Sequence, residues 1–191
     1  MDYTDIKNKL KEDLSQERYL HSIGTADCAS ELARIYGEDE EKAYLAGLLH
    51  DCAKCFPKEK LLEMTEKYVP IEISERENYK TLHAPVSAYV AQKDFGVTDS
   101  EILSAIRWHT LGKLDMTNFE KIIFLADKIE PNTRDKSYAQ NIKSVLKEQN
   151  GLNKAILMCY KETIKSLVAR DLKICTLTVE IYNKLQTMVQ K

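Results

Sequence analysis

The chain contains few residues that interrupt a helix. Its 191 residues include only six glycines and four prolines, well below average usage. No long stretch alternates apolar and polar residues as a half-buried strand would, and apolar residues instead recur at helical spacing. These features predict an all-α fold. The length fits one domain over residues 1–191, without an internal repeat or a linker.

Capping and helix-breaking residues place the expected helices. Gly37 ends one helical stretch and Pro57 restarts the chain as another. The segment 69–82 is expected to be an irregular connection, and the polar run 131–137 a loop. The expected helices cover about 4–14, 16–36, 39–51, 57–68, 84–95, 100–109, 118–130, 142–168 (with a candidate break at Gly151) and 176–189.

The charge balance argues against several classes of function. Lysine and arginine total 28 against 30 acidic residues, for a net charge of −2, whereas nucleic-acid binding usually demands a basic domain. The apolar runs are far shorter than the ~18 residues that a membrane span needs. Because the first residues lack the apolar core of a signal peptide, we expect a cytoplasmic protein without a membrane or nucleic-acid partner.

The five cysteines are scattered along the chain. Cys52 and Cys55 form a C-x-x-C pair, which could indicate a redox or zinc site. No second pair completes a structural zinc site, and no βαβ pattern surrounds this one as in thioredoxin-like proteins. Buried, reduced thiols are therefore the better account.

All four histidines and two aspartates fall in or beside helical, apolar stretches. They are His21, His50, Asp51, His83, His109 and Asp127. Imidazole nitrogens and carboxylate oxygens are good donors for first-row metals. One histidine at a helix edge is more often a packed residue, but a buried aspartate beside a buried histidine is costly without a metal or a partner. The set can hold two metal ions if Asp51 bridges them.

The His50–Asp51 doublet requires a particular backbone. Adjacent residues on an ideal helix point about 100° apart, so the two side chains cannot easily serve one metal from the middle of a helix. Both can converge where the helix ends, and the nearby proline favours such an end. The sequence therefore predicts that the doublet lies at a helix terminus.

Two basic residues stand one helical turn from these ligands. Arg18 precedes His21 by three residues, and Lys54 follows Asp51 by three, so each cation shares a helical face with a ligand. Each alone would be an ordinary solvated charge. Beside metal ligands they indicate an anionic substrate, most naturally phosphate. Two metals with adjacent cations predict a phosphoester or phosphoanhydride hydrolase.

The motifs around these residues resemble those of one family. They are Arg18-x-x-His21, Ala46-Gly47-Leu48-Leu49-His50-Asp51-x-Ala53-Lys54, Leu82-His83-Ala84-Pro85-Val86, His109-Thr110-x-Gly112, Ala126-Asp127-Lys128-Ile129-Glu130-Pro131 and Thr176-Leu177-x-x-x-Ile181-Tyr182-Asn183. In this order and spacing the chain resembles the HD-domain phosphohydrolase superfamily. It is more similar still to the bacterial symmetrical bis(5′-nucleosyl)-tetraphosphatases. The likeness spans nearly the whole chain and implies a single helical HD domain with C-terminal helices.

The resemblance implies a dinuclear centre of divalent or mixed-valence transition metals. Iron is the metal expected from the family, with manganese, cobalt or zinc as alternatives. One ion would be held by His21, His50, Asp51 and Asp127. The second would be held by His83, His109 and the bridging Asp51. The implied catalytic residues are Asp51, Lys54 and His109, and the implied substrate contacts are Arg18, Lys54, His83, Thr110 and Arg134.

The implied substrate is a dinucleoside polyphosphate. Attack of water at a β-phosphorus of diadenosine tetraphosphate would give two ADP. The chain departs from the family pattern in three places: Cys52 replaces a tyrosine or aliphatic residue, Ala84 replaces a frequent glycine, and the loop before Arg134 is one residue longer. The longer loop leaves the role of Arg134 open, and a homodimer is compatible with the pattern.

Other readings remain at this stage. A single-metal nucleotidase acting on nucleoside monophosphates would leave His83 and His109 without a role. Hydrolases of guanosine tetraphosphate or cyclic dinucleotides share the superfamily core but not this set of motifs. An HD-type di-iron oxygenase uses similar ligands, although Arg18 and Lys54 favour phosphate over a neutral polyol. A non-enzymatic helical interaction protein has no use for six converging ligands.

Overall fold

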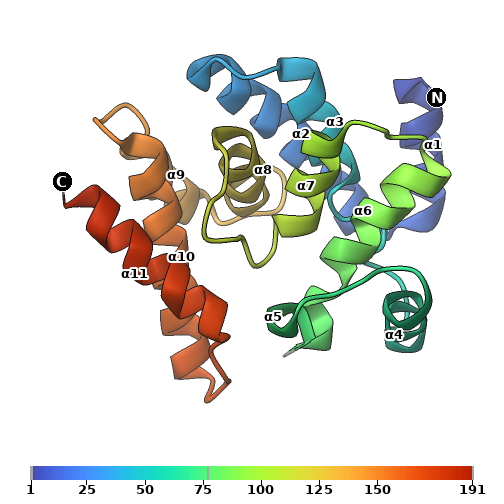
Figure 1. The fold of residues 1–191 in the computed structure, drawn as a ribbon. Coiled ribbons are helices and arrows are strands. Elements are labelled where there is room, and N and C mark those ends of the chain that lie inside the picture. Colours follow the sequence, from blue (N-terminus) through green and yellow to red (C-terminus); the bar gives the residue numbers. More distant parts are fainter. Residues whose placement is uncertain (1, 77, 191) are drawn as a thin grey trace.

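The computed structural model describes residues 2–76 and 78–190 of the chain. Within these residues it contains helices and loops and no strand, so the all-α prediction is confirmed (Figure 1). None of the helices in these two ranges is both long and apolar enough to cross a membrane. The elements are α1 (Tyr3–Asp13), α2 (Gln16–Tyr36), α3 (Glu40–Leu49), α4 (Lys58–Lys67), α5 (Ile73–Arg76), the 3₁₀-helix η1 (Tyr79–Thr81), α6 (His83–Asp94), α7 (Ser100–Trp108), α8 (Asn118–Ile129), α9 (Lys136–Ser144), α10 (Gly151–Ala169) and α11 (Thr176–Val189).

Most helices begin and end within two residues of their predicted positions. The side chains of Ser15, Asp39 and Thr117 each accept a hydrogen bond from the first turn of the following helix. Such caps satisfy N–H groups that have no partner within the helix. α2 ends as predicted at Gly37, whose left-handed backbone (φ 72°) lets its N–H reach the carbonyl of Ala33.

The expected helix over 142–168 is divided, which confirms its candidate break at Gly151, but its first residues, 142–144, belong to α9, a separate helix that the sequence did not predict. α9 ends at Ser144, residues 145–150 are not helical, and α10 starts at Gly151 directly after Asn150, whose backbone is left-handed (φ 60°). The preceding helix, α9, begins as early as Lys136 because the side chain of Asp135 accepts a hydrogen bond from the N–H of Tyr138. The predicted loop over 131–137 is therefore shorter by its last two residues.

The predicted irregular connection over 69–82 contains the short segments α5 and η1, and its residue 77 lies outside the described residues. Arg107 of α7 holds this connection in place. Its guanidinium donates to both carboxylate oxygens of Glu75, at 3.2 and 2.7 Å, and to the carbonyl of Pro70 at 2.9 Å. Glu75 is buried, so this bidentate pairing satisfies a charge that would otherwise be costly.

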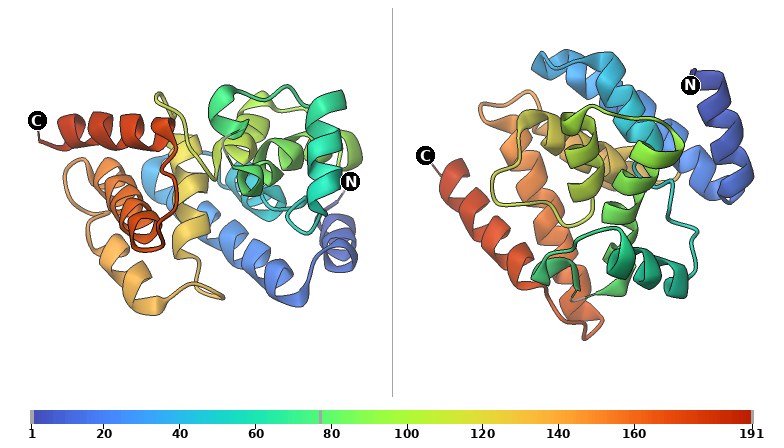
Figure 2. Two further views of the ribbon diagram at one scale, coloured as in Figure 1. Left: turned by 90° about the horizontal axis from the view of Figure 1, so that it is seen from below. Right: turned by 45° about the vertical axis from the view of Figure 1, so that its right-hand side comes forward.

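α8 runs through the middle of the molecule. It contacts α2, α3, α7, α9 and α10, and it lies between the N-terminal and the C-terminal helices in the views of Figures 1 and 2. Nearly all of its residues from Phe119 to Ile129 are buried, so it is apolar around most of its circumference. Because α8 is fixed from several sides, a polar residue in its last turn is held at a defined place in the interior.

Gly47 allows α2 and α3 to pack backbone against backbone. A Cβ atom at this position would lie 2.8 Å from the Cα of Ala26 and 2.9 Å from the carbonyl oxygen of Thr25. Both are backbone atoms of α2, which cannot rotate away as a side chain can. The carbonyl of Gly47 also accepts a hydrogen bond from Nδ1 of His50 at 2.7 Å, so this contact positions one of the predicted metal ligands.

We expect Gly47→Ala to destabilise the fold by about 1–3 kcal/mol, the usual cost of overpacking a core. For a protein of this size that corresponds to a fall in Tm of roughly 2–4 °C per kcal/mol. Thermal unfolding followed by circular dichroism measures it. Gly37→Asn is the control, because Gly37 has nothing within 4 Å of its Cβ position and asparagine tolerates a left-handed backbone. An unchanged Tm for Gly47→Ala would contradict the close packing.

Candidate metal centre

The structure brings the six predicted metal ligands together in the interior of the protein. None of them is more than 5% exposed. They come from α2 (His21), the turn after α3 (His50 and Asp51), the start of α6 (His83), the residue after α7 (His109) and the last turn of α8 (Asp127). Elements far apart in the sequence therefore converge on one buried cluster of imidazoles and carboxylates.

Asp51 lies between two pairs of histidines. Its Oδ2 is 3.8 Å from Nε2 of His21 and 3.5 Å from Nε2 of His50. Its Oδ1 is 3.1 Å from Nε2 of His83 and 3.4 Å from Nε2 of His109. Each pair with Asp51 forms a group whose donor atoms could hold a metal ion. One carboxylate thus faces both groups, as a bridging ligand would.

Asp127 adds a second carboxylate to the first of these groups. Its Oδ1 lies 3.0 Å from Nε2 of His21 and 3.8 Å from Nε2 of His50. The two groups are therefore unequal: one has two imidazoles and two carboxylates, and the other has two imidazoles and the shared Asp51.

The four imidazole rings are oriented through their Nδ1 atoms. In His50, His83 and His109, Nδ1 lies 2.7 Å from the backbone carbonyl three residues earlier, so it must be the protonated nitrogen. Nδ1 of His21 lies 3.1 Å from Oε1 of Glu130, a fully buried carboxylate. Each ring therefore turns its Nε2 lone pair toward the centre, as metal-binding histidines do.

This arrangement of donor atoms fits metal ions. The Nε2 atoms of His21 and His50 are 3.2 Å apart, and so are those of His83 and His109. Two facing lone pairs at this distance repel unless a proton or a metal ion lies between them. Oδ1 of Asp51 is also buried without a hydrogen-bond partner among the described residues. Imidazole nitrogen and carboxylate oxygen are the donors that first-row transition metals accept.

Burial and charge act in opposite directions on the carboxylates. Burial raises the pKa of Asp51, but the neighbouring imidazoles, His50 first, outweigh it and hold this pKa well below its usual range. Burial likewise raises the pKa of Asp127, but the positive charge of Lys128 is the main effect that outweighs it, and this pKa also lies well below its usual range. Burial lowers the pKa of His109 to about 3. At neutral pH both carboxylates are ionised and His109 is neutral, which are the states that bind metals.

The turn after α3 gives the His50–Asp51 doublet its geometry. α3 ends at Leu49, and the N–H of Lys54 then bonds to the carbonyl of Asp51, only three residues earlier. Ser87 of α6 fixes the turn from the other side, because its Oγ accepts the N–H of Ala53 at 3.0 Å. The prediction that the doublet lies at a helix terminus is confirmed.

Two of the predicted substrate cations contact the carboxylates directly. Arg18 donates from its guanidinium to Oδ2 of Asp51 at 2.8 Å, and Arg134 donates to Oδ1 of Asp127 at 2.6 Å. The Arg18 side chain is 25% exposed and that of Arg134 is 35% exposed. Both cations therefore border the cluster while keeping part of their surface open to solvent.

Lys54 and Thr110 border the second histidine pair. Nζ of Lys54 lies 3.0 Å from Nε2 of His83. Although part of this residue is open to solvent, protein atoms crowd its ammonium, and this burial lowers the pKa of Lys54. Oγ1 of Thr110 lies 3.1 Å from Nε2 of His83 and 3.0 Å from Nε2 of His109. All residues predicted as substrate contacts thus adjoin the ligand cluster.

Two residues at the cluster were given no role by the sequence. Nζ of Lys128 lies 2.5 Å from Oδ2 of Asp127. Glu130, besides facing His21, accepts the backbone N–H of Thr133 at 2.9 Å. Both residues lie in the run 126–131 that carries one of the motifs. The only signal in the sequence was this closeness to a ligand, because nothing local predicts that Glu130 reaches a ring on α2.

The cysteines follow the sequence expectation in part. Cys28, Cys52 and Cys159 are buried free thiols, whereas Cys55 is exposed and Cys175 is half-buried. Burial raises the pKa of Cys52 to about 12, so its thiol is protonated and unreactive. The expectation of buried thiols is wrong for Cys55, which lies at the end of the turn after α3 and faces solvent.

Known proteins resemble this chain in sequence and in fold. Residues 18–132, which include all six predicted ligands, match the model of the HD domain. The chain is 36% identical to the symmetrical bis(5′-nucleosyl)-tetraphosphatase of Bacillus subtilis, over 91% of this chain and 92% of the relative. It is 34% identical to the protein of the same name from Staphylococcus aureus, over 96% and 94% of the two chains.

A solved structure is similar along the whole chain. The crystal structure of a protein from Clostridium acetobutylicum, described as a predicted HD superfamily hydrolase involved in NAD metabolism, has a TM-score of 0.90 and 38% sequence identity, and the similarity covers 98% of each chain. The resemblance indicated by the motifs is confirmed, and this chain belongs to the HD-domain family of phosphohydrolases.

Proposed function

We propose that the protein is a symmetrical bis(5′-nucleosyl)-tetraphosphatase that uses two metal ions to hydrolyse diadenosine tetraphosphate to two ADP. The observation that carries the proposal is the position of Asp51, which faces His21 and His50 with one oxygen and His83 and His109 with the other. Relatives of that name align with more than nine tenths of the chain. The chain would act as one HD domain over residues 1–191.

The donor set suits two divalent or mixed-valence transition metals. Iron is our first choice, and manganese, cobalt or zinc could take its place. One ion would be held by His21, His50, Asp51 and Asp127, and the other by Asp51, His83 and His109. Bound ions would neutralise phosphate oxygens and lower the pKa of water, which makes hydrolysis possible at neutral pH.

The cations would bind the phosphate chain. Guanidinium and ammonium groups make charge-assisted hydrogen bonds to phosphate oxygens. Arg18 and Arg134 each use some of their N–H donors on a carboxylate of the cluster and retain others for the substrate. Lys54 would stabilise the charge that develops on the leaving phosphate. The hydroxyl of Thr110, at the second histidine pair, would donate to a neighbouring phosphate oxygen.

The alternatives fit the geometry less well. A single-metal nucleotidase would not need the group formed by Asp51, His83 and His109. An HD-type di-iron oxygenase could use the same ligands, but a neutral polyol would leave the cations Arg18 and Arg134 beside the centre without a function. Hydrolases of guanosine tetraphosphate or cyclic dinucleotides share phosphoester or phosphoanhydride hydrolysis with the proposed enzyme. Analysis of the reaction products distinguishes them from it.

The metal content tests the two-ion centre. We expect purified wild-type protein, fully loaded, to hold up to about two transition-metal ions per chain by elemental analysis. His83→Ala should lose mainly one ion, and Asp51→Ala should disturb both. Thr110→Val is the matched control, because its hydroxyl adjoins the same histidines but is a poor ligand. A single tightly bound ion in wild type, unaffected by His83→Ala, would rule out two ions.

The reaction products test the substrate. We expect chromatography of a diadenosine tetraphosphate digest to show ADP alone, because attack at a β-phosphorus divides the molecule symmetrically. Simple monoesters should be poor substrates, since binding energy comes from the polyphosphate chain. Asp51→Ala should be inactive. AMP together with ATP would place the attack at a terminal phosphorus, and faster hydrolysis of a nucleoside monophosphate would support the nucleotidase.

Lys54→Met separates substrate contacts from metal ligands. A protonated lysine is a poor ligand, so the variant should keep its metal content and fold while turnover falls by roughly tenfold or more. Steady-state kinetics and elemental analysis of one preparation measure both. Lys67→Met is the control, because this exposed lysine of α4 contacts only Glu63 among the ion pairs of the described residues. Wild-type kinetics for Lys54→Met would mean that Lys54 is an ordinary surface lysine.

A further inference from the structure

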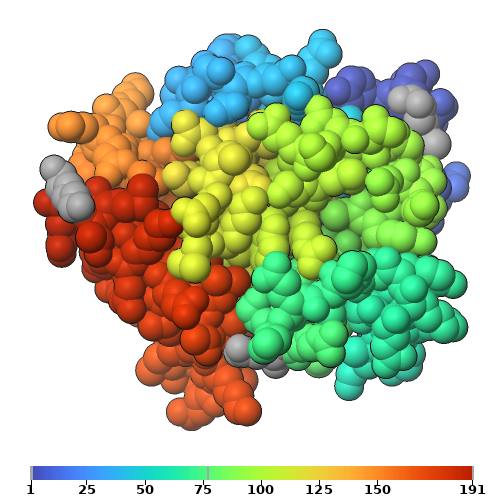
Figure 3. All heavy atoms as spheres, viewed as in Figure 1, coloured from blue at the N-terminus to red at the C-terminus, as the bar shows by residue number. Residues whose placement is uncertain are grey.

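A pocket of about 370 Å³ opens beside the metal centre. Thr110 connects the two, because it lines the pocket while its Oγ1 lies about 3 Å from Nε2 of both His83 and His109. Its volume falls in the range of sites that bind small molecules, roughly 300–1,000 Å³. The walls come from α5 and the residues around η1, the turn after α7, α8, α10, the connection to α11 and the start of α11. Figure 3 shows the C-terminal helices meeting the segment around residue 75 and the one after α7 on a single face.

The pocket combines apolar walls with polar side chains. Phe124 and Tyr160 form a stacked pair of rings, with centroids 5.3 Å apart and planes inclined by 11°. The apolar lining is completed by leucines: Leu111, Leu167 and Leu172. The polar lining includes Asn78, Thr81, Thr163 and Lys173. A nucleoside has the matching chemistry, because its base has apolar faces and polar edges and its ribose carries hydroxyl groups.

The turn that carries His109 and Thr110 is tied to this wall. The hydroxyl of Tyr160 donates to the carbonyl of Leu111 at 2.7 Å. Gly112 has a left-handed backbone (φ 74°), and a Cβ at that position would collide with the Tyr160 hydroxyl. Glycine is therefore needed for Tyr160 to reach the turn, which explains its place in the motif. The link fixes the distance between the pocket and the second histidine pair.

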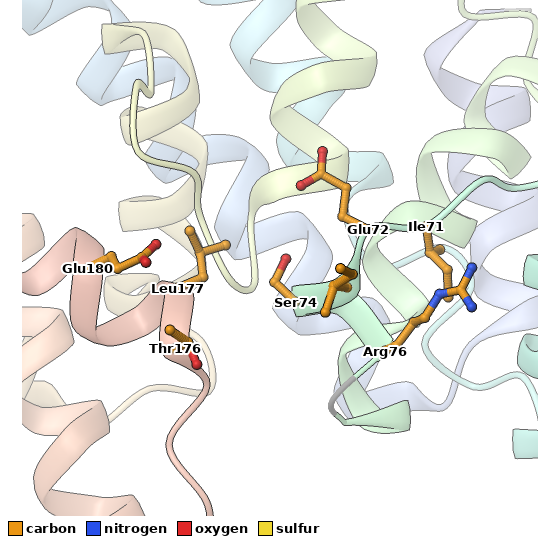
Figure 4. A pocket seen from close by; sticks show the side chains of 8 residues that line it. Ile71, Glu72, Ser74, Arg76, Thr176, Leu177 and Glu180 are labelled. Atoms are coloured by element: carbon orange, nitrogen blue, oxygen red, sulfur yellow. The ribbon is translucent and has the colours of Figure 1, made fainter.

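A second hollow, of about 740 Å³, is a poorer match for a nucleoside phosphate. It lies between α5 and the start of α11 and shares Ser74 with the first pocket (Figure 4). The carboxylates of Glu72 and Glu180 line it, and they would repel a polyphosphate that Arg76 alone would attract. Its lining includes neither a ligand of the metal centre nor Thr110.

We propose that the pocket beside Thr110 binds one nucleoside of the substrate, so that the phosphates attached to it extend past Thr110 into the metal centre. The inference rests on the proposed function in taking a nucleoside polyphosphate as the ligand. Tyr160, Thr163 and Leu172 then set the affinity for the nucleoside, whereas the metals and cations set the affinity for the phosphates.

Calorimetric titration of the metal-loaded protein with ADP and with pyrophosphate tests this division. ADP carries one nucleoside, and pyrophosphate carries none. Thr163→Trp places an indole in the pocket from an exposed position on α10, where it should not disturb the core. Ser166→Trp is the matched control, an exposed hydroxyl residue three positions further on the same helix and outside the pocket lining.

We expect wild-type protein to bind ADP more tightly than pyrophosphate. Thr163→Trp should weaken ADP binding by roughly tenfold or more, the size of effect expected from losing contacts to a base, and leave pyrophosphate binding unchanged. Ser166→Trp should bind both as wild type does. Equal affinity of wild type for ADP and pyrophosphate, or unchanged ADP binding by Thr163→Trp, would overturn the inference. Protein that binds as expected but does not convert diadenosine tetraphosphate to ADP would overturn only the proposed function.

Discussion

The arrangement of the centre depends on the buried carboxylate of Asp51. Removing an ionised carboxylate from water costs several kcal/mol unless opposite charge or hydrogen-bond donors surround it. Here Arg18 donates to Oδ2, whereas Oδ1 has no hydrogen-bond donor among the described residues, and the Nε2 atoms of two histidine pairs face the two oxygens. The residues around the carboxylate come from different helices, and together they leave part of its charge without compensation. A metal ion on each side of Asp51 would supply the positive charge that balances this buried carboxylate.

Helix termini make this convergence possible. The last carbonyls of a helix have no partner within it. The ring of His50 takes up such a carbonyl at the end of α3, and the ring of His109 takes up one at the end of α7. One hydrogen bond thus caps the helix, keeps the ring proton on Nδ1 and points the Nε2 lone pair inward. His83 makes the same kind of hydrogen bond at the start of α6, so three of the predicted ligands are oriented by their own local backbone.

Local signals in the sequence predicted most of the fold. Helical periodicity, caps such as Asp39 and breakers such as Gly37 placed most helix ends within two residues. The exception is the segment 136–150, where the sequence predicted neither α9 nor the non-helical stretch 145–150 that separates α9 from α10. The start of α9 depends on the cap at Asp135, which lies in a polar run whose composition favoured a loop.

The sequence also predicted which six residues gather, but not the contacts that orient them. The histidines and aspartates stand out because they lie in apolar stretches. Glu130 reaches His21 across 109 positions of the chain, and Glu75 meets Arg107 across 32, so no local pattern encodes either pairing. The sequence did not predict the pocket beside Thr110 either, because its walls come from segments that are adjacent only after folding.

The candidate metal centre and the pocket are built from different parts of the chain. All six predicted ligands lie within residues 18–132, the part that matches the HD-domain model. Tyr160, Thr163 and Leu172 of the pocket lie beyond it, on α10 and on the connection to α11. The hydrogen bond from Tyr160 to the turn after α7 joins the two parts. If the pocket binds a nucleoside as we propose, substitutions on α10 or on the connection to α11 would change the nucleoside that is accepted without altering the six predicted ligands.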